Sequence, residues 1–340
     1  MEFQKQLSFS KQQKGMALIL VLWMLSLMAI MAGSFALSMR RQLSIVEGIK
    51  NDAEALAQAE SGIALAENML LLPDQNKRWR ADGNVYQVDY ANSQTGAGSK
   101  VRVRLLSETG KIDINMADQA LLQSLMSHAP VEEAEQASLV GAIIDWRDTD
   151  DLIQLDGAEK NEYKAAGLSY GPRNKPFQSI EELQLVLGMN ETIYKWIEPL
   201  ITVHSGQAQV DKQLAGKEVL QILPEIEAAA TDSFIASRLD SAVNGLPAPG
   251  FPGGAAQTGS TGQKQSLTVV SEAMLENGSS ALVSVIITQS EDQQSTTPNQ
   301  STSPFQVLKW QRGASGDASL FTDEMSGLLV TEYAEPEFNN

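Results

Sequence analysis

The first strong feature of the hydrophobic pattern is an uncharged run from Met16 to Met39, which follows Lys14-Gly15 and precedes Arg40-Arg41. As a helix, this run would be about 36 Å long at about 1.5 Å per residue, which is enough to cross a hydrocarbon core of roughly 30 Å. The pattern therefore predicts a membrane-spanning helix over residues 16–39.

Apolar residues continue to recur every three or four positions beyond this run, as one helical stripe requires. The stripe consists of Leu43, Val46, Ile49, Ala53, Leu56, Ala59, Ile63, Ala66 and Leu70. Since Pro73 cannot continue a helix, we expect one helix from Met16 to about Leu72, with its second half packed on a soluble domain. A coiled coil would explain the second half equally well, but it would not predict the strands that follow.

Alternating and Val/Ile-rich segments predict strands on both sides of a helical region. The expected strands are 85–90, 101–105, 267–272, 281–288 and 305–312, and the expected helices are 116–126, 131–145, 180–187 and 191–199. Asp118 is a candidate N-cap, and Ser179 with Glu182 has the spacing of a capping box.

Residues 206–211 and 219–223 faintly repeat the strand and helix of 110–125, although chance explains this nearly as well. We expect Trp146, Trp196 and Trp310 to fill cores.

These elements predict an α+β fold in which a large all-helical insert interrupts a helix-on-sheet domain. The expected organisation is a leader at 1–15, a transmembrane part at 16–39, a helix with the first strands at 40–109, a helical insert at 110–203, a return segment with the remaining strands at 204–312, a Gly/Pro/Ser-rich mobile loop at 244–266 and an acidic, frayed tail at 313–340.

Composition lowers the expectation of several functions. The formal net charge of −17 disfavours binding to phosphate backbones, and the densest basic cluster, 77–80, is short. The chain has no cysteine, and its two histidines, His128 and His204, have no recognisable catalytic partners. It also lacks a Walker-type phosphate loop and an H-E-x-x-H helix. An enzymatic role is therefore not expected.

The segment before the apolar run is basic and ends in Gly15. This layout resembles the leader of type IV prepilins, which is cut on the cytoplasmic side after glycine, so the resemblance places cleavage between Gly15 and Met16. An ordinary uncleaved signal anchor is the alternative. Because basic residues flank both ends of the run, their count favours a cytoplasmic N-terminus only slightly, and orientation depends mainly on the leader.

The most distinctive soluble motif is Asp145-Trp146-Arg147-Asp148-Thr149-Asp150-Asp151, followed by Gly157-Ala158-Glu159. Carboxylates at alternating positions of a loop can converge on Ca²⁺, which accepts six to eight oxygens at about 2.3–2.6 Å. The motif does not match an EF-hand. A solvated acidic turn is an equally good interpretation of the spacing alone.

Together with Tyr170-Gly171-Pro172-Arg173-Asn174, Ser179-Ile180-Glu181-Glu182-Leu183 and Leu187-Gly188-Met189, this motif resembles the minor pseudopilin K family of bacterial type II secretion systems. The resemblance implies a pilin fold with a helical insert and bound calcium. Carried onto this chain, the implied ligands are Asp148, Asp150, Asp151 and Glu159, with Asp145 and Glu162 as outer candidates. The segment Val210-Asp211-Lys212-Gln213 departs from the turn expected of relatives.

Leu20 stands at the fifth mature position, where most pilin-like proteins carry glutamate for assembly. A charge within the bilayer is expensive and is retained only for a function, so its absence suits a subunit with none above it. Leucine is also simply a favourable lipid-facing residue in any anchor.

The resemblance therefore implies a non-enzymatic tip subunit of the pseudopilus. Its expected partners are minor pseudopilins I and J, the major pseudopilin, the prepilin peptidase and the inner membrane, with the secretin or exported cargo above it and no nucleic acid. It would cross the bacterial inner membrane once, with a periplasmic soluble domain. The alternative is a helix-hairpin-helix DNA-binding subunit of an uptake system, built around Leu187-Gly188-Met189. A periplasmic hydrolase lacks a convergent nucleophile and base.

Overall fold

The computed structural model describes residues 14–74, 76–91, 98–224, 226–252, 265–289, 303–313 and 319–331. The chain divides into two compact units, residues 1–54 and 55–340. The leader and most of the predicted mobile loop lie outside the described residues, apart from Lys14, Gly15 and the ends of the loop.

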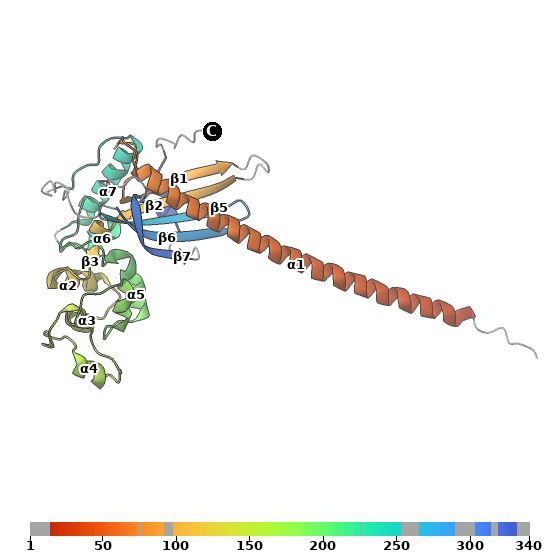
Figure 1. Cartoon of the computed structure of the whole chain (residues 1–340), viewed down its shortest axis with the longest axis horizontal. Coiled ribbons are helices and arrows are strands. Elements are labelled where there is room, and N and C mark those ends of the chain that lie inside the picture. Colours follow the sequence, from red (N-terminus) through yellow and green to blue (C-terminus); the bar gives the residue numbers. More distant parts are fainter. Residues whose placement is uncertain are drawn as a thin grey trace, which may run out of the picture. The chain divides into compact units, whose positions relative to one another are not determined.

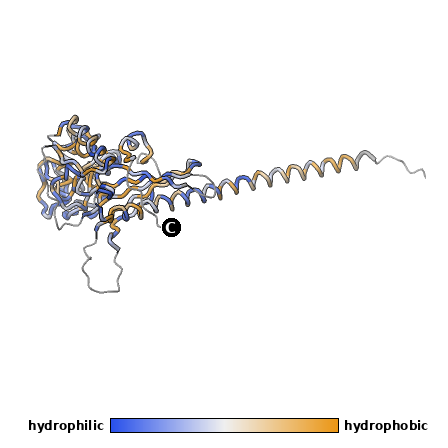
Figure 2. Tube along the Cα trace, turned by 90° about the horizontal axis from the view of Figure 1, so that it is seen from above, coloured by the Kyte–Doolittle hydropathy of each residue, from blue (hydrophilic) through white to orange (hydrophobic). Residues whose placement is uncertain are grey.

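The first unit contains most of helix α1, which extends from Lys14 to Leu70 and confirms the predicted long helix. Hydrophobic residues recur on every turn of its first half (Figure 2), and the large side chains from Leu18 to Met39 are exposed. Among the described residues, this is the one helix long and apolar enough to cross a membrane. It fits a single N-terminal membrane anchor.

The second unit contains a six-stranded sheet with the strand order β7-β6-β5-β2-β1-β8 (Figure 1). The strands are β1 (Asp82–Ala91), β2 (Gly98–Ser107), β5 (Ser266–Leu275), β6 (Ser280–Gln289), β7 (Phe305–Gly313) and β8 (Leu329–Val330). Neighbours pair antiparallel except β8, which pairs parallel with β1. All five strands predicted from the alternation are present.

The last turns of α1 pack on this sheet. Ala59, Ile63 and Met69 share a core with Val103 and Val285. The approach is so close that a Cβ added to Gly62 would lie 2.2 Å from Ser271 Oγ and 2.9 Å from Val101 Cγ1. Glycine at this position therefore lets the helix backbone rest directly on the strands.

The helical insert has its own core and enters and leaves the sheet domain through two short parallel strands, β3 (Ile112–Asp113) and β4 (Ile201–Thr202). Between them lie α2 (Gln119–His128), α3 (Glu133–Arg147), α4 (Lys160–Ala165), a 3₁₀ helix at Ile180–Leu185, α5 (Glu191–Ile197) and a 3₁₀ turn at Glu198–Leu200. After β4 come α6 (Lys217–Ile222) and α7 (Ala228–Val243). Asp118 caps α2 as predicted, because its side chain accepts from Leu121 N at 2.8 Å.

Four expectations are wrong. The Ser179 side chain makes no cap hydrogen bond, since Glu182 turns instead to Arg173 and Gln178 N. Residues 206–211 form no strand. The tail is structured over 319–331, where α8 (Asp323–Ser326) and β8 lie. Trp310 is 42 % exposed, because β7 is an edge strand with a mostly exposed face. Trp146, by contrast, is buried as predicted.

Candidate functional site

The C-terminal end of α3 is fixed by aromatic packing and by one arginine. The buried Trp146 ring lies against Phe177, with ring centroids 6.1 Å apart, and against Tyr163 at the same centroid distance. Arg147 donates to the backbone carbonyls of Ile114 and Ala117. These contacts fix the orientation in which Asp145 and the following acidic residues leave the helix.

Asp145 organises the loop that connects α3 to α4. Its buried carboxylate accepts from Gln154 N at 3.1 Å and from Ala158 N at 2.8 Å. The loop passes so close that a Cβ on Gly157 would lie 2.1 Å from Asp145 Oδ2, and one on Gly141 would lie 2.7 Å from Gly157 Cα. Two glycines thus allow the loop backbone to reach the carboxylate, a role that their spacing in the sequence does not indicate.

Three further predicted residues hold the loop from its outer side. Asp150 Oδ1 accepts from Leu152 N at 2.9 Å, and Asp151 Oδ1 accepts from Asn174 Nδ2 at 2.9 Å. Glu162 Oε2 accepts from Glu159 N at 2.9 Å at the start of α4. The sequence motif at 170–174 contains Asn174 but does not indicate its role in this loop. The Asn174 backbone adopts φ +52°, a left-handed conformation that asparagine tolerates well.

Four oxygens of this acidic cluster are buried and have no hydrogen-bond partner in the described structure. They are Asp148 Oδ1, Glu159 Oε1, Glu159 Oε2 and Asn174 Oδ1. None of the ion pairs among the described residues includes any of the six predicted carboxylates. Uncompensated buried oxygens of this kind are costly and call for a cation or a proton.

The electrostatics of the cluster agree with this view. Burial, with repulsion from Asp145, Asp148 and Asp151, raises the pKa of Glu159 to about 7. Burial and the charges of Asp150 and Asp145 also raise the pKa of Asp148. The carboxylates therefore lie close enough to disfavour each other's charged forms.

The donor chemistry of the cluster fits a hard cation, because every candidate ligand is an oxygen and several are unpartnered. The geometry does not form a complete set of ligands. Within the described part of the chain, no three His, Cys, Asp or Glu side chains are arranged so that they could hold a metal ion. A bound cation would thus require rotation of side chains such as Asp148 and Glu159, and further oxygens from the loop backbone.

The turn at Leu187-Gly188-Met189 has the geometry of a helical hairpin. Gly188 adopts φ +89°, and Asn190 caps α5 by accepting from Ile193 N. Its charged neighbours on the two flanking helices are mainly acidic, and Lys195 is paired with Glu191 at 2.7 Å. Phosphate groups would be repelled at this turn, which disfavours the DNA-binding alternative.

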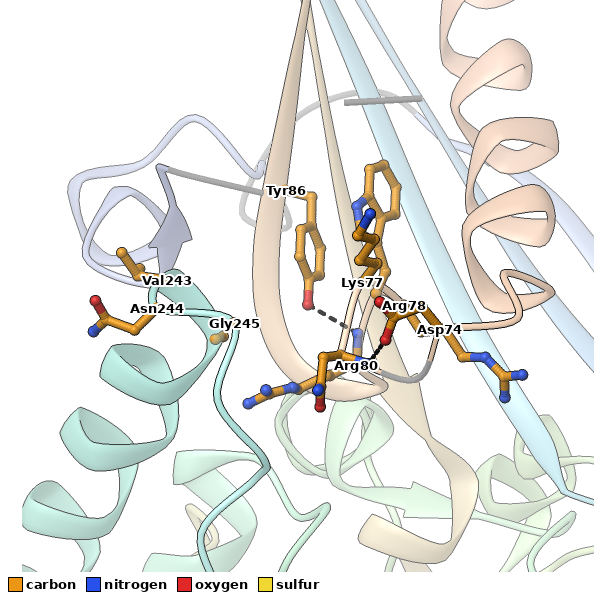
Figure 3. Close-up of a pocket in the computed structure, with 11 residues that line it drawn as sticks. Asp74, Lys77, Arg78, Arg80, Tyr86, Val243, Asn244 and Gly245 are labelled. Atoms are coloured by element: carbon orange, nitrogen blue, oxygen red, sulfur yellow. Dashed lines mark hydrogen bonds between the residues drawn. The ribbon is translucent and has the colours of Figure 1, made fainter. Parts of the chain in front are cut away.

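An open pocket of about 390 Å³ lies between the segment before β1 and the C-terminal end of α7 (Figure 3). Trp79 stacks on Tyr86 at 4.6 Å, and the Tyr86 hydroxyl accepts from Arg80 N. The Arg80 guanidinium donates to Ser241 Oγ and to the Leu246 carbonyl, so it caps the negative end of the α7 dipole. Arg80 therefore has a structural role in joining α7 to the sheet domain.

Comparisons with known proteins give concordant results. Residues 99–206 match the family model described as type II secretion system protein K. The chain is 25 % identical over 204 residues to the type II secretion system protein K of Klebsiella pneumoniae, covering 56 % of this chain and 62 % of that protein. It is 26 % identical over 211 residues to the protein K of Aeromonas hydrophila, covering 56 % and 63 %. The matches thus span less than two thirds of these relatives.

A solved structure shares the fold. A chain of the GspK-GspI-GspJ complex from the type 2 secretion system of enterotoxigenic Escherichia coli superposes with a TM-score of 0.50 at 18 % identity. The superposition covers 79 % of this chain and 99 % of that one. A long helix on an antiparallel-dominated sheet, interrupted by a helical insert, is a pilin-like α+β fold, as predicted. Within this class, the chain is similar to the protein K family of type II secretion systems, whose family model matches residues 99–206.

Proposed function

We propose that this chain is a non-enzymatic minor pseudopilin that caps the tip of the type II secretion pseudopilus. In this role it would initiate pseudopilus assembly with minor pseudopilins I and J, and the major pseudopilin would then extend below it. Growth of this fibre would drive export of folded proteins across the outer membrane. The single observation that carries the proposal is the bulky insert fixed to a pilin-like helix and sheet.

The insert is attached at two points, and both attachments are buried. Glu108 lies at the start of the insert and receives hydrogen bonds from Thr202 after it and from Thr268 on β5. Asp113 accepts from Ser205 Oγ at 3.0 Å and from Gly206 N at 2.8 Å. An insert held this firmly adds constant bulk to the subunit, which favours a terminal position over one within a regular helical fibre.

The N-terminal region supports the same position. Leu20 would occupy the fifth mature position without the carboxylate expected to pair with a subunit above. The anchor would place the N-terminus in the cytoplasm and the second unit in the periplasm, where the secretin and exported cargo are the expected contacts of the insert.

Replacing Gly15 tests the leader. We expect the wild-type chain to acquire Met16 as its N-terminus in cells with a prepilin peptidase, and Gly15→Ala to remain unprocessed. Intact-mass and N-terminal peptide mass spectrometry measure both. Gly33→Ala is the matched control, because Gly33 lies in the same helix and an added Cβ would contact nothing within 4 Å. A mature N-terminus at any other residue would refute the leader assignment.

Complex formation tests the tip assignment. We expect the processed full-length chain, co-expressed with I- and J-class minor pseudopilins and purified in detergent, to form a ternary complex with one copy of each subunit. Native mass spectrometry measures the stoichiometry. Failure to associate with both partners would contradict the proposal, and tight, salt-sensitive binding of the chain to duplex DNA would favour the alternative.

We further propose that the acidic cluster between α3 and α4 binds calcium. Asp148, Asp150, Asp151 and Glu159 would be its side-chain ligands, and Asn174 is an added candidate because its buried Oδ1 has no partner. Asp145 and Glu162 would support the loop, since their carboxylates already accept hydrogen bonds from its backbone. When bound, the ion would offset part of the negative charge of the cluster and further stabilise the loop.

A further inference from the structure

The loop between α3 and α4 carries an apolar group on its outer side, which we call the finger: Leu152, Ile153 and Leu155. These side chains are 72 %, 52 % and 86 % exposed, and Leu155 is the most exposed large apolar side chain among the described residues. α3 and α4 lie in the part of the insert farthest from the sheet in the view of Figure 1. The finger is thus available at the surface of the insert.

The backbone beneath the finger is fixed on both sides. Asp145 holds Gln154 N and Ala158 N, and Asp150 holds Leu152 N. Gly157 N also donates to the Gln154 carbonyl at 2.9 Å, next to Asp156 in a left-handed conformation with φ 62°. A loose loop could fold three large apolar side chains onto the core, whereas this fixed backbone presents them outward.

Clustered apolar side chains on a fixed surface loop indicate an interaction site. We propose that the finger inserts into an apolar pocket, rimmed by lysine or arginine, on a partner protein. The rim follows from charge complementarity. The exposed Asp156 lies beside Leu155, and residues 148–159 contain five carboxylates and no Lys or Arg, so this loop keeps a net negative charge even with a divalent cation bound. The same carboxylates would be repelled by an anionic membrane surface, which favours a protein partner over a lipid one.

A photo-crosslinking residue at position 155 of the full-length chain, in cells of the source species, identifies the partner. The proposal expects one dominant protein adduct whose linked peptide combines apolar residues with Lys or Arg. The control position is Leu246, an exposed leucine outside the finger that is 52 % exposed. Adducts with lipid, with a second copy of this chain, or equally at position 246 would overturn the proposal, as would no adduct or a linked peptide without basic residues.

Binding of the purified adduct partner then measures the contribution of the finger. The variant Leu152→Ser/Ile153→Ser/Leu155→Ser should bind at least about 100-fold more weakly, since burying each such side chain is worth roughly tenfold in affinity. Leu246→Ser should bind like the wild type, and added salt should weaken wild-type binding. Unchanged affinity of the triple variant, or affinity independent of salt, would overturn the proposal. So would a large loss of thermal stability in the triple variant, because exposed side chains should not support the fold.

Discussion

Glu108→Gln is expected to lower the free energy of unfolding of the second unit by roughly 3 kcal/mol, as is typical when one partner of a buried charged pair is removed. Glu108 is 1 % exposed and lies 2.7 Å from Lys111 Nζ. Its two oxygens also accept hydrogen bonds from Thr202 and Thr268. The substitution leaves a largely buried ammonium without its counter-ion at the point where the insert joins the sheet.

The pH dependence should carry a specific signature. Burial acts to raise the pKa of Glu108, but the charge and hydrogen bond of Lys111, with those of Thr202 and Thr268, lower it below its ordinary value. A carboxylate with a lowered pKa in the folded state stabilises the protein above the ordinary carboxyl pKa of about 4.5, and this contribution is lost as the pH falls through the lowered value. The difference in stability between wild type and Glu108→Gln should therefore shrink below about pH 4.5.

Thermal unfolding of the full-length chain in detergent, from pH 7 to pH 3, measures both effects. The matched control is Glu191→Gln, which removes an equally short pair with Lys195 on the exposed surface of α5. That variant should unfold at the wild-type temperature at neutral pH, because exposed pairs contribute little. If the difference between wild type and Glu108→Gln stayed constant down to pH 3, the assigned role of the Glu108 charge would be wrong.

The sequence predicted the helices and strands that bury one face made of apolar side chains. α1 and the strands were predictable because their apolar residues follow the helical or strand period over many positions. α7 was not, because its buried face includes Thr231, Arg238 and Ser241 beside Phe234 and Ile235. Arg238 is buried because it donates to the Ala215 carbonyl and lies 3.8 Å from Asp82, contacts that join distant parts of the chain and leave no local pattern.

The acidic motif was visible in the sequence, but the separate roles of its members were not. Spacing placed Asp145 and Asp148 in one cluster, yet the structure uses Asp145 to bind the loop backbone and leaves an oxygen of Asp148 unpartnered. That division depends on the close approach of Gly157 to α3, which a single sequence does not reveal. Similarly, alternation assigned Trp310 to a strand, but not to the edge of the sheet.

Calcium is expected to raise the unfolding temperature of the full-length chain, and chelation with EGTA to lower it. A ligand that binds only the folded state stabilises it by about 2.7 kcal/mol at one hundred times its dissociation constant. Differential scanning fluorimetry over a calcium titration measures the shift, and isothermal titration calorimetry checks binding directly. An unchanged unfolding temperature between EGTA and millimolar calcium would argue against the site.

The variant Glu159→Gln should separate calcium binding from general stability, because its effect should change sign with the metal. In EGTA it removes a buried carboxylate whose pKa is raised to about 7 by burial and by its acidic neighbours, so the variant should be at least as stable as the wild type near pH 8. In calcium it lacks a charged ligand, so it should be less stable than the wild type. Asp156→Asn is the control within the same loop, because asparagine tolerates the left-handed backbone at this exposed position, and it should keep the full response to calcium. If calcium bound the loop backbone alone, Glu159→Gln would keep the calcium response of the wild type. A variant that is at least as stable as the wild type in EGTA but less stable in calcium would assign Glu159 as a ligand of the ion.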